Sequence, residues 1–182
     1  MGLDMYLSKK TYVKQWEHNK PEEQFEVSVK LGGKPFKKIE SSRVSYVTEE
    51  LMYWRKANQI HGWFVHNTQE VVEDVKYYVT KEDLDNLLDV CKQVLDVLSK
   101  SEIKTVQVRS GWSGGEEIYS DVETYDCEDE IRELLPPTEG FFYGSYEIDE
   151  WYKNNIEETV EFLEKELPKC DEHDDFEYYA SW

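Results

Sequence analysis

TKEDLDNLLDVCKQVLDVL, residues 80–98, is the stretch that most clearly fixes an element of the fold. Thr80 and Asp83 match a capping box in which Asp takes the place of Glu. Seven apolar residues then recur at the spacing of one helix face: Leu84, Leu87, Leu88, Cys91, Val94, Leu95 and Leu98. The stretch therefore predicts a long amphipathic helix that buries one face, with Cys91 as a buried thiol and not a nucleophile.

Further elements are predicted outward from this helix. Alternating apolar residues predict strands at residues 3–7, 25–31, 75–80 and 103–109, with a hairpin return at 36–39. Thr48, followed by Glu49 and Glu50, predicts the start of a helix that runs to about Val65. The segment from Asp121 predicts a strand that leads into a short helix, which ends before Pro136 and Pro137.

Asp149 predicts the N-terminal cap of another helix, which ends near residue 166 before Pro168. The last segment, residues 171–182, is either a final strand or a docked tail. No internal repeat and no linker interrupts the chain. We therefore expect an α+β fold, with residues 1–182 as a single compact domain in which a small antiparallel sheet packs with about three amphipathic helices.

The net charge of −19 is confined to the last two-fifths of the 182 residues. From Ser110 onward there are 23 acidic and four basic residues, whereas residues 1–109 carry equal numbers of each. The expected domain thus has a charge-balanced part, 1–109, and a strongly acidic part, 110–182. Charge segregated in this way is informative about partners, and it favours a basic protein groove over nucleic acid or an anionic membrane.

Three widely spaced cysteines fit a reducing cytoplasm better than a disulfide framework. No apolar run approaches the length of a membrane span, so we expect no membrane contact. The sequence contains no nucleophile elbow, phosphate loop or calcium loop. Cys170, His173 and Asp174 form a metal-like cluster but lack a second ligand pair. We therefore expect neither an enzyme, nor a metal site, nor a cofactor.

The acidic part supplies the candidate partner-binding residues. Trp112 lies in the glycine-flanked segment 110–115, where it is either an exposed contact residue or folded back onto the core. Glu157, Glu161 and Glu164 form a carboxylate row on one face of the helix predicted after Asp149. The remaining candidates are the carboxylates of Glu116, Glu117, Asp121, Glu123, Asp126, Glu128, Asp129 and Glu130.

Two other groups of residues suggest alternative sites. Trp54, Asn58 and His61 share one face of the helix predicted over residues 49–65, where they are either packing residues or the wall of a small-ligand pocket. A basic cluster is the second group, and it is either a solvated hairpin or a weak contact for nucleic acid. Its members are Lys30, Lys34, Lys37, Lys38 and Arg43.

Three long motifs also carry a resemblance: MGLDMYL at residues 1–7, YWRKANQIHGWF at 53–64 and LPPTEGFFYGS at 135–145. In this order, and across nearly the whole chain, they resemble a widespread family of small phage and mobile-element proteins. In length and acidity the chain is also similar to the type II-A anti-CRISPR proteins, which are inhibitors of the Cas9 nuclease.

The resemblance implies a function but assigns no residue roles. It implies a phage-encoded protein that acts in the bacterial cytoplasm and binds Cas9 with its guide RNA. An acidic, aromatic surface entering the basic DNA channel would block DNA binding or cleavage. The alternative function is the binding or sequestering of a small ligand by the Trp54, Asn58 and His61 face.

Overall fold

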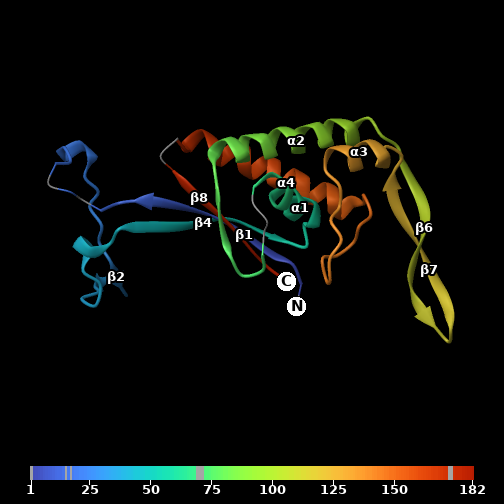
Figure 1. The fold of residues 1–182 in the computed structure, drawn as a ribbon, viewed down its shortest axis with the longest axis horizontal. Coiled ribbons are helices and arrows are strands. Elements are labelled where there is room, and N and C mark those ends of the chain that lie inside the picture. The colour runs from blue at the N-terminus through green and yellow to red at the C-terminus, as the bar shows by residue number, and fades with distance from the viewer. Residues whose placement is uncertain (1, 15, 17, 69–71, 172–173) are drawn as a thin grey trace.

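A four-stranded antiparallel sheet forms one layer of the computed structural model, which describes residues 2–14, 16, 18–68, 72–171 and 174–182 (Figure 1). The strands lie in the order β4-β1-β8-β5. Their bounds are Asp4–Tyr12 for β1, Tyr46–Arg55 for β4, Lys76–Val79 for β5 and Asp175–Ser181 for β8. The last strand, β8, therefore inserts between β1 and β5, and residues at the two ends of the described chain pair directly.

One face of this sheet is covered by helices, as Figure 1 shows. The described helices are α1 (Asn58–Asn67), α2 (Lys81–Ser99), α3 (Glu128–Leu134) and α4 (Glu150–Glu166), with short 3-10 turns η1 (Pro21–Glu23), η2 (Ser41–Arg43) and η3 (Leu167–Lys169). Met5 and Leu7 of β1, Trp54 of β4 and Tyr178 of β8 are buried beneath them. These side chains belong to one hydrophobic core, which also includes the apolar faces of α2 and α4.

The caps of the two long helices confirm the sequence predictions. The Asp83 backbone N–H donates to the Thr80 hydroxyl at 3.0 Å, and the Thr80 N–H donates to the Asp83 carboxylate at 2.8 Å. Asp149 accepts a hydrogen bond from the Tyr152 N–H at 2.9 Å and so begins α4. Cys91 on α2 is fully buried, and burial raises the pKa of its thiol to about 12.

Two hairpins extend from opposite ends of the molecule in Figure 1. The shorter pairs β2 (Lys30–Leu31) with β3 (Lys34–Pro35), and the longer pairs β6 (Ile103–Ser113) with β7 (Glu116–Tyr125). Together with the central sheet and the helices they confirm the expected α+β fold. The end of the chain is the predicted final strand, since β8 pairs on both sides.

The helix predicted from Thr48 to about Val65 is wrong in its first part, because residues 46–55 form β4 and the helix α1 begins only at Asn58. Thr48 and Glu49 pair with β1 opposite Lys10 and Lys9, so a long-range ladder overrides the local helix signals. Lys56 then adopts a left-handed backbone with φ of 57° and separates β4 from α1. The strand predicted over residues 25–31 is also wrong except for Lys30 and Leu31, and its partner strand is 34–35 instead of 36–39.

Two of the three long motifs, residues 53–64 and 135–145, meet in one place. The Asn58 side chain donates to the carbonyls of Tyr143 at 3.3 Å and Ser145 at 2.7 Å, and it accepts from the Thr138 N–H at 3.1 Å. A Cβ at Gly62 would lie 1.9 Å from the Thr138 hydroxyl oxygen, so only glycine permits this approach. The motifs therefore build a packing unit between α1 and residues 138–145.

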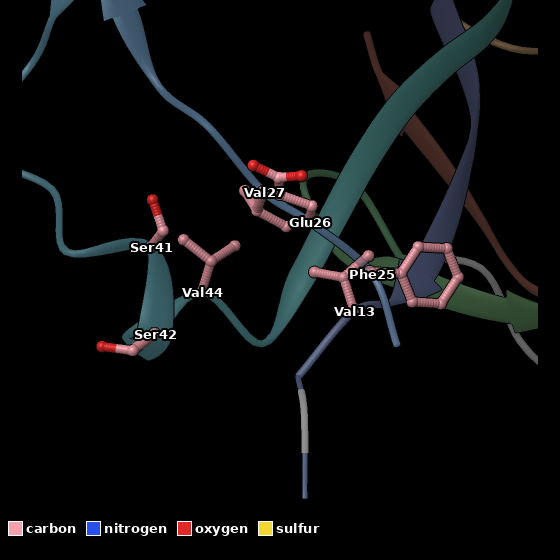
Figure 2. A pocket seen from close by; sticks show the side chains of 7 residues that line it. All are labelled: Val13, Phe25, Glu26, Val27, Ser41, Ser42 and Val44. Atoms are coloured by element: carbon pink, nitrogen blue, oxygen red, sulfur yellow. The ribbon is translucent and has the colours of Figure 1, made fainter. Parts of the chain in front are cut away.

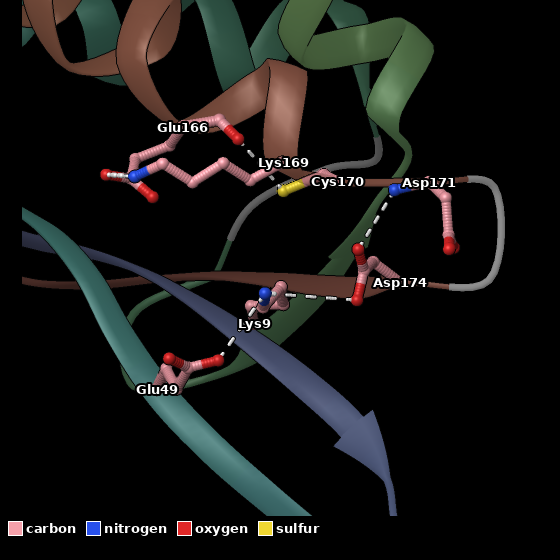
Figure 3. Close-up of polar contacts among 7 residues, drawn as sticks. All are labelled: Lys9, Glu49, Glu166, Lys169, Cys170, Asp171 and Asp174. Carbon is pink, nitrogen blue, oxygen red and sulfur yellow. Dashed lines mark hydrogen bonds and ion pairs between the residues drawn. The ribbon is translucent and has the colours of Figure 1, made fainter. Parts of the chain in front are cut away.

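A polar cluster joins the end of α4 to the sheet (Figure 3). The Lys9 ammonium lies 3.4 Å from the Glu49 carboxylate and 4.0 Å from that of Asp174. The Cys170 thiol donates to the Glu166 carbonyl at 3.3 Å, and partial burial raises its pKa. The predicted partner of Cys170 in a metal-like cluster, His173, lies outside the described residues.

Candidate functional site

The β6–β7 hairpin, here called the ribbon (residues 103–125), is the most projecting element of the acidic part (Figure 1). Gly114 and Gly115 form its two-residue turn with φ of 61° and 89°, the positive pair that a type I′ turn requires. The predicted loop at 110–115 is therefore shorter than expected, since β6 continues to Ser113. A bulge between Arg109 and Gly111 absorbs one residue of the register.

One face of the ribbon combines carboxylates with aromatic rings. Because side chains alternate along a strand, Glu117, Tyr119, Asp121 and Glu123 of β7 point to the same side. Trp112 lies directly opposite Glu117 in the pairing register and joins this side. We call these five residues the acidic face of the ribbon. It contains four of the predicted partner-binding residues and adds Tyr119.

Hydrogen bonds hold part of this face in place. Arg109 donates to Glu117 at 3.1 Å, and the Tyr119 hydroxyl donates to the other Glu117 oxygen at 2.5 Å. The hydrogen bond from Tyr119 lowers the pKa of Glu117 most, and the bond from Arg109 lowers it further. Gln107 donates to Asp121 at 3.2 Å. Glu123 and Glu116 form no ion pair with any described residue, so their charges are free for a partner.

Trp112 is 61% exposed, which decides between the two alternatives left open by the sequence. The ring does not fold back onto the core, and its described cation contact is Arg109, whose guanidinium carbon lies 5.7 Å from the ring centroid. A large exposed indole at a ribbon tip is a typical anchor for a protein partner.

The predicted carboxylates beyond the ribbon divide into two groups. Asp126 and Glu128 have structural roles: Asp126 accepts from the Glu102 N–H at 3.0 Å and closes the ribbon base, and Glu128 pairs with Arg132 at 2.7 Å. Asp129 and Glu130, in the first turn of α3, are exposed and form no ion pair with the described residues. They extend the acidic surface past the ribbon base.

The carboxylate row on α4 is exposed as predicted, but two of its members are paired. Glu164 lies 2.8 Å from Lys92 of α2, and Glu157 lies 3.5 Å from Lys153. Glu161 forms no ion pair with any described residue. Glu157 also raises the pKa of Tyr125 at the ribbon base, although burial raises it more. The row therefore begins near the ribbon and ends beside α2.

Trp54, Asn58 and His61 are buried packing residues. Trp54 lies on β4 and not on the predicted helix, and its indole N–H donates to the Thr159 hydroxyl at 2.9 Å. His61 contacts the Tyr178 hydroxyl at 2.8 Å and the Tyr143 hydroxyl at 3.3 Å, and burial lowers its pKa to about 4. Each side chain is about 2% exposed, so they form no open wall for a ligand.

The basic cluster is exposed at the other end of the molecule. Lys30 and Lys34 lie on β2 and β3, and Lys37, Lys38 and Arg43 follow them. Arg43 pairs with Glu40 at 2.8 Å. Beside the cluster lies a cavity of about 350 Å³. Figure 2 shows the side chains that line it, which are Val13, Phe25, Glu26, Val27, Ser41, Ser42 and Val44. Its lining combines four apolar side chains with Glu26, Ser41 and Ser42, and it contains none of the five basic residues.

Two features of the exposed surface are not apparent from the sequence alone. Neither Tyr119 nor Arg109 was among the predicted site residues. Tyr119 alternates with Glu117 and Asp121 along β7, and Arg109 of β6 lies opposite Tyr119 in the pairing register, so all four share one face. The open face of the central sheet was also missed, because its tyrosines come from strands far apart in the chain. Neither relation is visible without the strand register.

The described side chains contain no group of three or more His, Cys, Asp and Glu residues arranged to hold a metal ion. Among the described helices, none combines the length and apolar character that a membrane span requires. Comparison of the chain with protein-family models, with curated proteins and with solved structures found no match in any of the three. The function must therefore be argued from the surface itself.

Proposed function

We propose that this protein is a binding protein, not an enzyme, that inserts the acidic face of its ribbon into the basic nucleic-acid groove of another protein. The observation that carries the proposal is the combination of Glu117, Asp121 and Glu123 with Trp112 and Tyr119 on one side of a projecting hairpin. A basic groove attracts the carboxylates, and the two rings supply the anchors that dominate affinity at protein interfaces.

The spacing of the carboxylates suits partial mimicry of a nucleic acid backbone. Alternate residues of a strand lie about 6.8 Å apart, whereas one strand of B-form DNA presents a phosphate about every 3.4 Å along its axis. The ribbon is therefore less dense in charge than DNA, and Asp129, Glu130 and Glu161 add charge near its base. The hairpin is narrow enough to enter a groove, because only two strands form it.

Together with the sequence resemblance, this surface favours a Cas9-type nuclease with its guide RNA as the partner. In that complex the ribbon would occupy the channel that receives DNA and so block DNA binding or cleavage. The protein would then be a phage-encoded inhibitor that acts in the bacterial cytoplasm. No feature of the buried Trp54, Asn58 and His61 group favours the small-ligand alternative.

Binding to a purified Cas9–guide RNA complex, measured at increasing salt, tests the proposal. We expect affinity to fall at least about tenfold between about 50 and 200 mM salt, as for a contact dominated by charge. The variant Asp121→Lys/Glu123→Lys should bind at least about tenfold more weakly than the wild type. A matched control, Asp89→Lys/Glu139→Lys, makes the same charge change at exposed residues away from the ribbon and should bind like the wild type.

Two results would contradict the proposal. If the wild type fails to associate with the complex at low salt, Cas9 is not the partner. If both double variants lose affinity equally, the binding reflects net charge and not the ribbon. Trp112→Ala provides an independent check, because it removes an anchor and leaves the charge unchanged.

A further inference from the structure

The face of the central sheet opposite the helices carries a row of tyrosines. Tyr53 of β4, Tyr6 of β1 and Tyr179 of β8 are direct neighbours in the pairing register. The ring centroid of Tyr6 lies 5.1 Å from that of Tyr53 and 5.8 Å from that of Tyr179. Tyr78 of β5, opposite Glu177, extends the row to the edge strand. We call these four residues the tyrosine face.

The tyrosine face is open to solvent. Tyr53 is 44% exposed and Tyr78 is 58% exposed, and Tyr6 and Tyr179 are partly exposed between them. The alternate residues of the same strands, among them Met5, Trp54 and Tyr178, are buried beneath the helices. An exposed aromatic surface of this kind is characteristic of a binding site, because tyrosine is enriched where proteins bind partners.

Two carboxylates fix the rings. The Tyr53 hydroxyl donates to Asp4, and the Tyr179 hydroxyl donates to Asp74 at 2.6 Å. Asp74 reaches Tyr179 from a left-handed backbone conformation with φ of 59°, which is costly for a residue other than glycine. Each carboxylate keeps its second oxygen free of any described hydrogen bond. The face thus offers ordered ring surfaces with acceptors at their edges.

The cations on this face do not oppose a positively charged ligand strongly. Lys10 and Lys76 both bind Glu177, and Lys76 lies 3.1 Å from it. Arg55, opposite Asp4, is the remaining cation among the paired residues of this face. Asp4, Asp74, Glu50, Asp175 and Glu177 outnumber these three bases. The local charge of the face is therefore negative and favours a cationic ligand over a polyanion.

We propose that the tyrosine face binds arginine side chains of a basic protein partner. A planar guanidinium stacks on a tyrosine ring and donates two parallel hydrogen bonds to a carboxylate, whereas a lysine ammonium does neither as well. Tyr53 with Asp4, and Tyr179 with Asp74, each provide both elements. This surface is separate from the ribbon, so the inference does not depend on the function proposed above.

Titration with two synthetic peptides tests the proposal. The peptides have the same length and the same charge, and they carry the charge either on arginine or on lysine. At near-physiological salt we expect the arginine peptide to bind the wild type about threefold to tenfold more tightly than the lysine peptide. This preference should be lost in Tyr53→Thr/Tyr179→Thr, in which threonine retains the strand propensity.

Tyr46→Thr is the matched control, because Tyr46 is also an exposed tyrosine of β4 but has no described hydrogen bond to a carboxylate. It should keep the preference for arginine. Loss of the preference in Tyr119→Thr, and not in Tyr53→Thr/Tyr179→Thr, would assign it to the tyrosine–carboxylate pair of the ribbon. Proton NMR of the wild type gives a second measurement that needs no variant: the arginine peptide should shift ring signals of Tyr6, Tyr53 and Tyr179.

Three outcomes would overturn the inference. One is equal affinity for both peptides together with unshifted ring signals. Another is wild-type self-association in sedimentation velocity that Tyr53→Thr/Tyr179→Thr abolishes, which would make a second copy the occupant. The third is tighter binding of a single-stranded oligonucleotide than of the arginine peptide to the same tyrosines.

Discussion

The indole N–H of Trp54 on β4 lies 2.9 Å from the hydroxyl oxygen of Thr159 on α4 and joins two elements that are 105 residues apart. Thr159 in turn donates its hydroxyl proton to the Asn155 carbonyl at 2.6 Å. Both side chains are buried, so water cannot replace either partner. This contact fixes the position of α4, and with it the first residues of the carboxylate row, above the sheet.

Thr159→Val should destabilise the fold by about 1–3 kcal/mol, because it leaves the buried Trp54 N–H without an acceptor. The free energy of unfolding from urea titration measures this effect. Thr105→Val makes the same chemical change at an exposed position of the ribbon, where it should cost no more than about 0.5 kcal/mol. Equal effects of the two substitutions would mean that the Trp54 contact contributes nothing specific.

His61 should make stability depend on pH between its unfolded and folded pKa values. The unfolded side chain binds a proton below pH 6.5, whereas burial holds the folded pKa at about 4. The unfolded state therefore gains protons first as pH falls, and stability is lost from pH 6.5 down to about 4. The wild type should lose roughly 2–3 kcal/mol more than His61→Gln between pH 7.5 and 4.5.

His66→Gln provides the control for this prediction. His66 is an exposed histidine on the same helix, and its substitution should leave the wild-type pH dependence in place. A pH dependence of His61→Gln identical to that of the wild type would show that His61 is not the group responsible.

Gly115→Val should open the tip of the ribbon without unfolding the core. The left-handed backbone at this position costs a residue with a Cβ about 1–2 kcal/mol, and valine is especially unfavourable there. Since a two-stranded hairpin is marginally stable alone, amide exchange in residues 108–120 should accelerate several-fold. Gly114→Asn, which produces the favoured Asn-Gly turn, should leave exchange close to the wild-type rate.

Cys91 should resist alkylation in the folded protein. A thiol pKa raised from 9 to about 12 lowers the thiolate fraction at pH 8 by roughly a thousandfold, and full burial blocks access as well. Cys127 and Cys170 are partly exposed and should react first. Mass spectrometry of peptides after brief iodoacetamide treatment distinguishes the three. Labelling of Cys91 at the rate of Cys127 without unfolding would contradict this reading.

The sequence predicted those elements whose signals are local. For α2 and α4, the capping residues Thr80 and Asp149 and the apolar stripes agree, so both helices form close to the predicted bounds. Strand β4 was predicted as a helix because Thr48, Glu49 and Glu50 imitate a capped helix start. Its pairing with β1 through residues 46–55 decides the outcome, and that pairing depends on tertiary contacts.

The candidate sites also divide into features that local sequence signals predict and features that depend on strand pairing. The exposed carboxylates of the ribbon and of α4 were predictable, because charge alone keeps such residues at a surface. That Glu117, Asp121 and Glu123 share a side with Trp112 depends on the bulge at Ser110, which shifts the register by one residue. Tyr53 belongs to the segment that was predicted as a helix, and only the strand β4 places it on the solvent-facing side of the sheet.

Asn58 also determines where this chain tolerates engineering. Residues 138–145 contain no helix or strand, yet the buried Asn58 amide bonds their backbone at three points. A peptide tag or fluorescent reporter inserted there would remove the framework that positions Tyr143 above His61. The two-glycine tip of the ribbon, by contrast, has open space around both residues, so an insertion there would spare the core and would block only the entry of the ribbon into a groove.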